Sequence, residues 1–95
     1  MKKYSVEIVI PIYNEEEELE KNITKLHSFA VKNLTLYDWH ITIADNASTD
    51  KSLAIAQKIS KEKSHLGFVH LDQKGRGRAV KKAWKQNIAD IRLVF

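Results

Sequence analysis

The fold is decided by residues 6–15, Val6-Glu7-Ile8-Val9-Ile10-Pro11-Ile12-Tyr13-Asn14-Glu15. The first five are mostly β-branched, which predicts a short buried strand over residues 6–10. Pro11 is expected to end this strand, and Asn14 is suited to cap a following helix. That helix is indicated by four apolar residues that recur at steps of four, three and four along one face: Leu19, Ile23, Leu26 and Ala30.

The same order of strand, polar segment and helix then recurs. Residues 39–44 predict a second strand, and Ser48 or Thr49 is suited to cap the helix after it. The apolar residues that give this second helix one buried face are Leu53, Ala56 and Ile59.

A third unit follows, in which residues 68–71 predict a strand. The third helix is marked by apolar residues at helical spacing: Val80, Ala83, Trp84 and Ile88. Residues 91–95 predict a fourth strand. Such alternation predicts an α/β fold with an open, Rossmann-like parallel sheet and helices on its faces.

The composition is that of one small globular domain of 95 residues, 43% hydrophobic and 29% charged. The chain has no cysteine, which excludes disulfides and thiolate metal sites. Its net charge of +4 is unevenly distributed, because residues 1–50 carry a net charge of −4 and residues 51–95 one of +8. The basic second half favours an anionic partner such as phosphate, nucleic acid or a membrane surface. No apolar run approaches the ~18 residues that span a bilayer.

Polar segments follow the first three strands, at residues 11–15, 45–50 and 74–78. Open α/β sheets bind ligands outside the carboxyl ends of their strands, so we expect these segments to gather there. An aromatic ring and a carboxylate in the first segment suit a base and a ribose. A carboxylate at Asp45 can accept a hydrogen bond from a nucleobase N–H. Together the segments suit a nucleotide with a phosphate tail.

The third segment, Gly75-Arg76-Gly77-Arg78, leads into a helix. Glycines let backbone N–H groups approach an anion, and arginine can grip phosphate through two hydrogen bonds. The segment is neither a dinucleotide fingerprint, because Val80 stands at the position of the third glycine, nor a P-loop, because no Gly-Lys-Ser/Thr occurs. By itself this motif is a weak signal.

Each segment also has a structural interpretation. Glu15 is a favourable carboxylate for the first turn of a helix, and residues 45–50 are good turn and capping residues. The basic residues 74–85 around Trp84 would also suit a non-enzymatic nucleotide- or RNA-binding module. Trp84 lies on the apolar stripe of its helix, however, which favours a place in the core. The four histidines lack metal-type spacing, and most of them are expected to be structural or surface residues: His27, His40, His65 and His70.

Taken together, the three segments resemble the family 2 glycosyltransferases, which have the GT-A nucleotide-sugar fold. Residues 9–15 match the opening strand and loop of that family almost residue for residue. Residues 43–50 match its second loop, usually Asp-Asp-Gly-Ser-Thr-Asp, from which Asn46 and Ala47 depart. Residues 74–84 look like the version found in polyprenyl-phosphate (dolichyl-phosphate-like) sugar synthases. The resemblance covers essentially the whole chain.

The resemblance implies which residues bind the donor nucleotide: Pro11, Tyr13, Glu15, Asp45, Gly75, Arg76, Gly77 and Arg78. The first three would line the base and ribose pocket, and Asp45 would hydrogen-bond the base. The arginines, supported by the glycines, would lie over the base or the diphosphate. The donor would be a UDP- or GDP-sugar, and the acceptor a polyprenyl phosphate at the cytoplasmic face of a membrane. No nucleic acid partner is expected.

The resemblance also implies that residues 1–95 are the nucleotide-sugar-binding half of a GT-A domain, truncated before the family's Asp-x-Asp metal motif. No catalytic or metal-binding residue is therefore assigned, and the isolated chain is expected to be inactive. The Mg²⁺ or Mn²⁺ expected for the intact enzyme would bind that motif. An exposed fourth strand at residues 91–95 predicts a homodimer, since bare strand edges pair with other chains.

Overall fold

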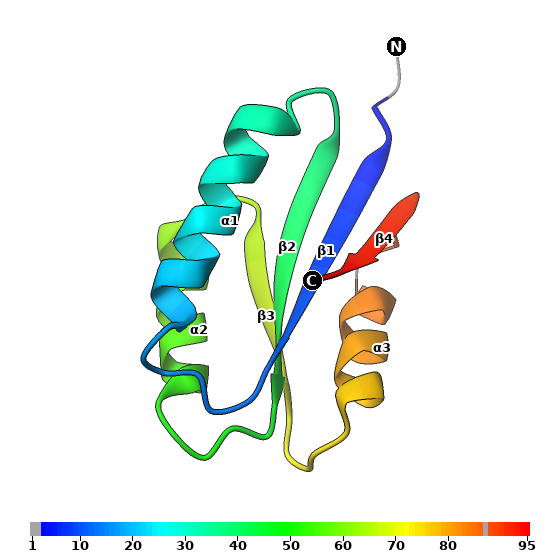
Figure 1. Ribbon diagram of the computed structural model, residues 1–95. Coiled ribbons are helices and arrows are strands. Elements are labelled where there is room, and N and C mark those ends of the chain that lie inside the picture. Colours follow the sequence, from blue (N-terminus) through cyan, green and yellow to red (C-terminus); the bar gives the residue numbers. More distant parts are fainter. Residues whose placement is uncertain (1–2, 87) are drawn as a thin grey trace.

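The computed structural model describes residues 3–86 and 88–95, which form seven alternating strands and helices (Figure 1). The elements, in chain order, are β1 (Ser5–Ile12), α1 (Leu19–Asn33), β2 (Asp38–Asn46), α2 (Ser52–Glu62), β3 (Leu66–Leu71), α3 (Arg76–Gln86) and β4 (Ile91–Val94). Every strand and helix expected from the sequence is present, and the α/β fold class is confirmed.

The four strands make one parallel sheet in the order β3-β2-β1-β4. The central pair, β1 and β2, is in register from Ser5 opposite Asp38 to Ile12 opposite Asp45. Because all strands are parallel, their carboxyl ends lie at one edge of the sheet, and the three polar segments leave the sheet at that edge (Figure 1). This is the edge at which open α/β sheets bind ligands.

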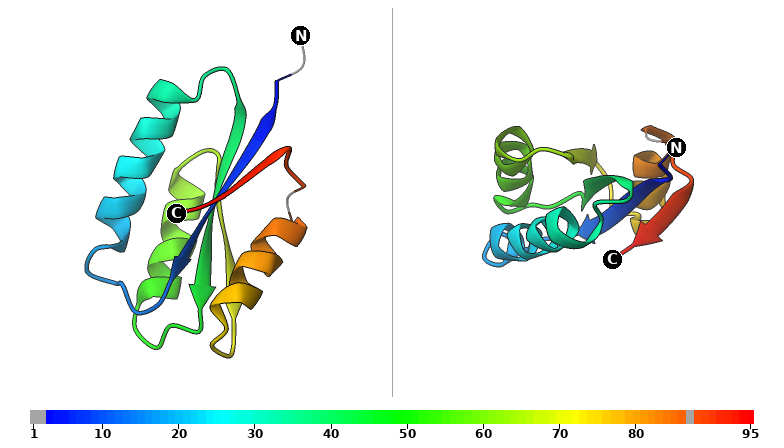
Figure 2. Two further views of the ribbon diagram at one scale, coloured as in Figure 1. Left: turned by 45° about the vertical axis from the view of Figure 1, so that its right-hand side comes forward. Right: turned by 90° about the horizontal axis from the view of Figure 1, so that it is seen from above.

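Helices cover both faces of the sheet, α1 and α2 on one face and α3 on the other (Figure 2). The larger core lies under α1 and α2, where the expected stripe of α1 is buried against the side chains of one sheet face. The smaller core lies under α3 and contains Val9, Ala44 and Val69 from the sheet with Ala79, Val80 and Ala83 from the helix. Residues that alternate along β1, β2 and β3 therefore enter different cores, as the period of two in a strand requires.

Strand β1 extends past Pro11, so the expectation that proline ends the strand is wrong. Pro11 pairs with Ala44 of β2, and the strand continues to Ile12. Its missing N–H costs no ladder hydrogen bond for a geometric reason. Phe95 N–H donates to Val9 O, which shows that the backbone groups of Val9 face β4, and those of Pro11, two residues on, face the same side. In the described residues the pairing of β1 with β4 ends at Val9 opposite Val94, so β4 offers no partner that an N–H of residue 11 would need.

Several helix boundaries also differ from expectation. Helix α1 begins at Leu19 after Glu18, so Asn14 does not cap it, and α2 begins at Ser52 after Lys51, so neither Ser48 nor Thr49 is its cap. Helix α3 ends at Gln86, which leaves Ile88 outside the helix and 88% exposed. Asn14, Ser48 and Thr49 instead form hydrogen bonds with one another between the two loops. Such hydrogen bonds compete with helix capping.

Strand β4 is an outermost strand of the sheet and, among the described residues, pairs only with β1. Its apolar side chains are exposed: Ile91, Leu93, Val94 and the adjoining Phe95. At the other end of β4, Asp90 accepts hydrogen bonds from the backbone N–H and the hydroxyl of Ser5, which hold the start of the strand against β1. Among the described helices, none is both long and apolar enough to cross a membrane.

Candidate functional site

Asn14 ties the first two loops together. Its side-chain oxygen accepts hydrogen bonds from the backbone N–H groups of Thr49, at 2.8 Å, and Asp50, at 3.3 Å. Its own N–H donates to Ser48 Oγ at 3.0 Å, and Glu15 N–H donates to Ser52 Oγ at 2.8 Å. The two loops are therefore held side by side at the carboxyl edge of β1 and β2.

Asp50 adds a second tie between these loops. Its two carboxylate oxygens accept hydrogen bonds from the backbone N–H groups of Ser52, at 2.8 Å, and Glu16, at 3.2 Å. Desolvation raises the pKa of Asp50, but the hydrogen bonds from Ser52 and Glu16 outweigh it, so its pKa lies below the ordinary value. Asp50 is thus an ionised anchor of the loop rather than a proton donor.

The third loop joins the other two through one contact with each. Gly75 N–H donates to Asn46 Oδ1 at 2.6 Å, which connects the end of β2 to the start of α3. Lys74 Nζ lies 4.1 Å from the centre of the Tyr13 ring, a cation–π contact with the first loop. The predicted gathering of the three segments at one edge is therefore present in the fold.

The glycine–arginine segment does not form a free loop, because α3 already begins at Arg76. Gly77 and Arg78 thus lie in the first turn of the helix and are exposed. Arg78 folds back, and its Nη2 donates to Lys74 O at 2.9 Å. A Cβ at Gly75 would lie 2.6 Å from Arg78 Nε, so the glycine allows this close approach. The side chain of Arg76, the main predicted phosphate ligand, lies outside the described part of the chain.

Asp45 has a partner that the sequence analysis missed. It lies opposite His70 in the register of β2 and β3, and Oδ2 accepts a hydrogen bond from His70 Nδ1 at 2.7 Å. The Asp45 side chain is completely buried, yet Oδ1 has no hydrogen-bond partner among the described residues. The one hint of this pairing in the sequence is that Asp45 and His70 both come shortly before the ends of their strands.

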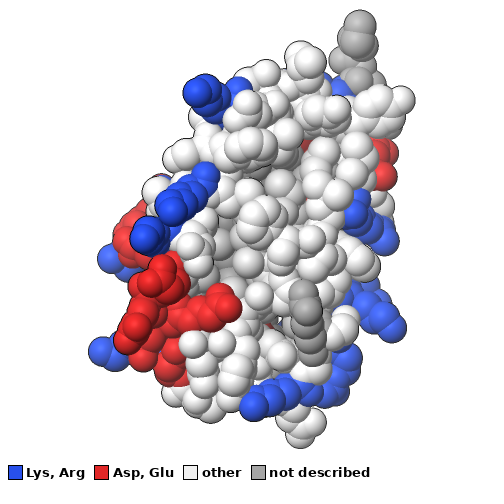
Figure 3. Space-filling view, viewed as in Figure 1, with Lys and Arg blue, Asp and Glu red and all other residues white. Residues whose placement is uncertain are grey.

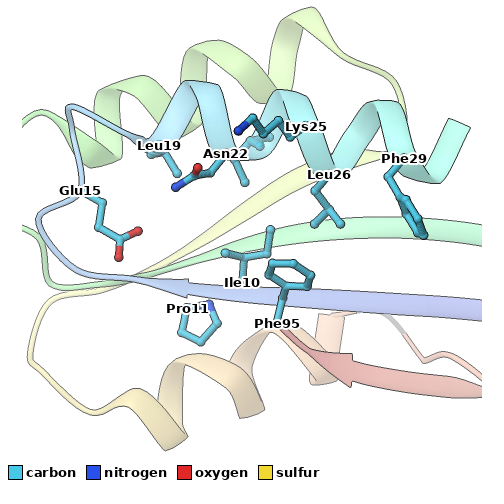
Figure 4. Close-up of a pocket in the computed structure, with 10 residues that line it drawn as sticks. Ile10, Pro11, Glu15, Leu19, Asn22, Lys25, Leu26, Phe29 and Phe95 are labelled. Atoms are coloured by element: carbon cyan, nitrogen blue, oxygen red, sulfur yellow. The ribbon is translucent and has the colours of Figure 1, made fainter.

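Pro11 and Glu15 lie beside this edge and also line a groove (Figure 4). The groove has a volume of about 670 Å³ and runs between α1, β1 and the Phe95 ring. Its walls are mainly apolar, with Lys25 as the one cation among the lining residues. The polar residues in its lining are Glu15, Asn22 and Lys25. The loop edge, where the three predicted segments meet, remains the candidate nucleotide site.

Charge is divided across the surface as the sequence predicted. Acidic side chains gather where α1 begins, and lysines and arginines lie around α3 (Figure 3). The acidic group lines a shallow hollow and contains Glu15, Glu16, Glu17, Glu18 and Asp50. Within residues 3–86 and 88–95, no group of three or more acidic or histidine side chains is arranged to hold a metal ion.

Trp84 is half-buried and packs against the core under α3, as its place on the helix stripe indicated. Its ring is covered on one side by Arg92, whose guanidinium carbon lies 5.9 Å from the ring centre. A ring so packed is a poor platform for stacking a nucleic acid base. Lys81, Lys82 and Lys85 are exposed, and Lys82 donates to the main-chain oxygen of His70 at 2.7 Å.

Comparison with known proteins identifies the family. The model of glycosyl transferase family 2 matches residues 7–94, almost the entire chain, and the chain belongs to this family. Among solved structures, the chain is similar to mannosyltransferase PcManGT from Pyrobaculum calidifontis, in complex with GDP-Man and Mn²⁺. The TM-score is 0.79 at 18% sequence identity, and the match covers 97% of this chain but 27% of that one. This likeness establishes the fold. No curated protein matches the chain.

The first testable prediction concerns Ala47, which stands where the family usually has glycine. Its φ is 58°, in the left-handed region that is unfavourable for side chains with a Cβ. Ala47→Gly should therefore raise the free energy of unfolding, by roughly 0.5–1 kcal/mol after the entropy of glycine is subtracted. The midpoint of urea denaturation measures this change.

Asn14→Gly is the matched control, because Asn14 has a similar φ of 50°. Here the side chain accepts hydrogen bonds from two backbone N–H groups, and its loss should lower stability by about 1–2 kcal/mol. Stabilisation by both substitutions would contradict the assignment of Asn14 as the tie between the loops.

Proposed function

We propose that this chain is the donor-nucleotide half of a glycosyltransferase that uses a UDP- or GDP-sugar. The observation that carries the proposal is the buried Oδ1 of Asp45, which has no hydrogen-bond partner among the described residues and lies at the edge where the three loops meet. A buried acceptor without a donor costs free energy, and a ligand N–H relieves that cost. Uracil and guanine both offer such an N–H. Since Asp45 is fully buried, a base can reach it only when the surrounding loops shift apart.

The remaining loop residues suit the other parts of such a donor. The Tyr13 ring is 38% exposed at the edge, where it can pack on a base or ribose. Glu15 is exposed beside it and can accept hydrogen bonds from ribose hydroxyls. The exposed first turn of α3, with Arg78 and Lys74 close together, favours the negative diphosphate.

In the proposed reaction, an acceptor oxygen attacks the anomeric carbon of the sugar while the bond to the nucleoside diphosphate breaks, with inversion. A divalent ion such as Mg²⁺ or Mn²⁺ would neutralise the departing diphosphate. The described residues hold no fitting metal cluster and no assigned catalytic base, so those groups would come from outside this chain. Support for a GDP-sugar comes from the similar mannosyltransferase, which was solved with GDP-Man and Mn²⁺.

We propose a polyprenyl phosphate as the acceptor, and the cytoplasmic face of a membrane as the place of reaction. The support is the sequence of residues 74–84, which resembles polyprenyl-phosphate sugar synthases, and the exposed lysines of α3. An anionic lipid headgroup and a membrane surface both favour a cationic face. Supplying the acceptor to an intact family member would test this part.

The second prediction is that the 95-residue chain binds nucleotides without transferring sugar. Base and ribose contacts are available, but a metal cluster for the diphosphate is not found among the described residues, so binding should be weak and largely independent of Mn²⁺. Titration of UDP, GDP and their sugars, followed by NMR with and without Mn²⁺, measures this. Shifts should concentrate in residues 11–15, 45–50 and 74–78.

The same titration, repeated with RNA and at several salt concentrations, distinguishes the proposed function from the main alternative, a non-enzymatic RNA-binding module that uses the basic residues 74–85. RNA binding through phosphates would fall steeply with salt, whereas recognition of a base by Asp45 would be much less sensitive. Salt-sensitive binding of RNA together with no response to UDP or GDP would replace the proposed function. Measurable sugar transfer by the isolated chain would contradict the view that it is only the donor half.

The third prediction concerns Asp45→Asn. The asparagine keeps one oxygen that can accept from His70 but puts an amide N–H₂ where the free oxygen lay. Binding of UDP or GDP should weaken by about 1.5–3 kcal/mol while the melting temperature changes little. Isothermal titration and thermal unfolding give the two readouts. Asp38→Asn, an exposed change at the other end of β2, is the control and should alter neither.

The fourth prediction is that two copies of this chain associate through β4. Its exposed apolar residues leave an open edge, and such edges pair with other chains. Since Phe95 N–H donates to β1, the N–H of Val94 faces the open edge. Val94→Pro should therefore shift the chain toward monomer without breaking the ladder to β1, whereas Val94→Thr should not. Light scattering across a dilution series measures the mass, and a wild-type monomer at high concentration would contradict the dimer.

A further inference from the structure

The sheet contains two pairs in which a buried carboxylate lies opposite a histidine. Glu7 on β1 is in register with His40 on β2, and Asp45 on β2 is in register with His70 on β3. The carboxylate is buried in both, with an exposed fraction of 1% for Glu7 and 0% for Asp45. In both, histidine Nδ1 contacts one carboxylate oxygen, at 3.0 Å for Glu7 and 2.7 Å for Asp45.

The two pairs differ at the second carboxylate oxygen. Glu7 Oε1 accepts a hydrogen bond from the hydroxyl of Thr42, so both of its oxygens are satisfied within the sheet. Asp45 Oδ1 has no donor among the described residues. Glu7 lies near the amino ends of the strands, away from the loops, whereas Asp45 lies where the loops gather. The first pair is a complete structural unit, and the second is one donor short at the ligand edge.

His70 is itself held in place. Its Nε2 lies 3.2 Å from Asp72 Oδ1, and its main-chain oxygen accepts from Lys82 Nζ. The contact of His70 Nδ1 with Asp45 Oδ2, at 2.7 Å, fixes the rotation of the Asp45 side chain. With Oδ2 held, Oδ1 has one orientation, and a ligand that reaches it must bring a donor.

We propose that His70 is a positioning residue that makes the site select bases with a ring N–H on the Watson–Crick edge, uracil and guanine, against adenine and cytosine, whose N–H groups on that edge are exocyclic. This inference rests on the proposed function, because it assigns a base to Asp45. Adenine and cytosine carry an unprotonated ring nitrogen at the corresponding position, whose lone pair opposes the fixed oxygen. A site whose buried polar group is left unpaired rejects such analogues strongly. Without His70, the Asp45 carboxylate can rotate away from the base. The affinity for uracil and guanine and the discrimination against adenine and cytosine then both decrease.

The experiment compares the affinities of the 95-residue chain for UDP, GDP, ADP and CDP by NMR titration. His70→Leu should weaken binding of whichever of UDP and GDP the wild-type chain prefers by roughly 10-fold, and change that of ADP and CDP by no more than about twofold. His70→Asn should restore most of the preference, because its amide N–H₂ lies near the place of Nδ1. His70→Gln should not restore the preference, because its amide lies nearer the place of Nε2. If His70→Leu does not fold, His70→Gln takes its place in the comparison.

Two controls separate positioning from stability. Asp72→Asn removes only the exposed partner of His70, so affinity should change by about twofold at most. His40→Leu disturbs the equivalent pair at Glu7 and should lower the melting temperature without altering the preference among bases. In the free wild-type protein, the Nδ1-bound proton of His70 should be protected from exchange, and Asp45→Ala should abolish that protection.

The outcomes distinguish this inference from the proposed function. If the wild-type chain binds no nucleotide, the proposed function fails and the selectivity of His70 fails with it. If the wild-type chain prefers UDP or GDP but His70→Leu weakens all four nucleotides equally, or none, the proposed function stands and the positioning role is overturned. An unprotected Nδ1 proton in the free protein would overturn it independently of any ligand.

Discussion

The parallel pairing of β1 with β2 is the constraint on which the rest of the molecule depends. It brings Ile12 opposite Asp45 and thereby places the first two loops next to each other. A parallel pair requires a crossover on a face of the sheet, and the crossovers here are helices that bury both faces. The central strands are consequently apolar on both sides, and Glu7 is tolerated there only because Thr42 and His40 satisfy its carboxylate.

Gathering three loops at one edge has a conformational cost, and it is concentrated in two residues. Asn14 and Ala47 both adopt left-handed backbone conformations in the first two loops. Asparagine tolerates this conformation and uses its side chain to bind the neighbouring loop, whereas alanine gains nothing comparable. The strain at the edge is thus offset by hydrogen bonds between the loops, which hold the first two loops side by side.

The two buried carboxylates of this small sheet differ in how completely their hydrogen bonds are satisfied. At the amino ends of the strands, the buried carboxylate of Glu7 is fully satisfied by its neighbours. At the carboxyl ends, Asp45 has a partner at one oxygen and, within the part of the chain that the structure describes, none at the other. Because an unpaired buried acceptor is unfavourable, its presence at the loop edge is a stronger indication of function than the acidic residues exposed at the start of α1.

The sequence by itself determined the order of strands and helices, most of the residues that face the cores, and the family. Apolar periodicity and three ordered motifs carry that information, because they depend on residues that are close together in the chain. Two expected core residues were wrong, because Ile88 is exposed and Ile55 rather than Leu53 packs against the core from α2. The sequence also misplaced the end of β1 at Pro11 and the caps at Asn14, Ser48 and Thr49. Only the tertiary structure decided those points, since the missing N–H of Pro11 faces an unpaired position and the polar side chains bind across loops. The pairing of Asp45 with His70, 25 residues apart in the chain, depends on the register of β2 and β3, which no local pattern specifies.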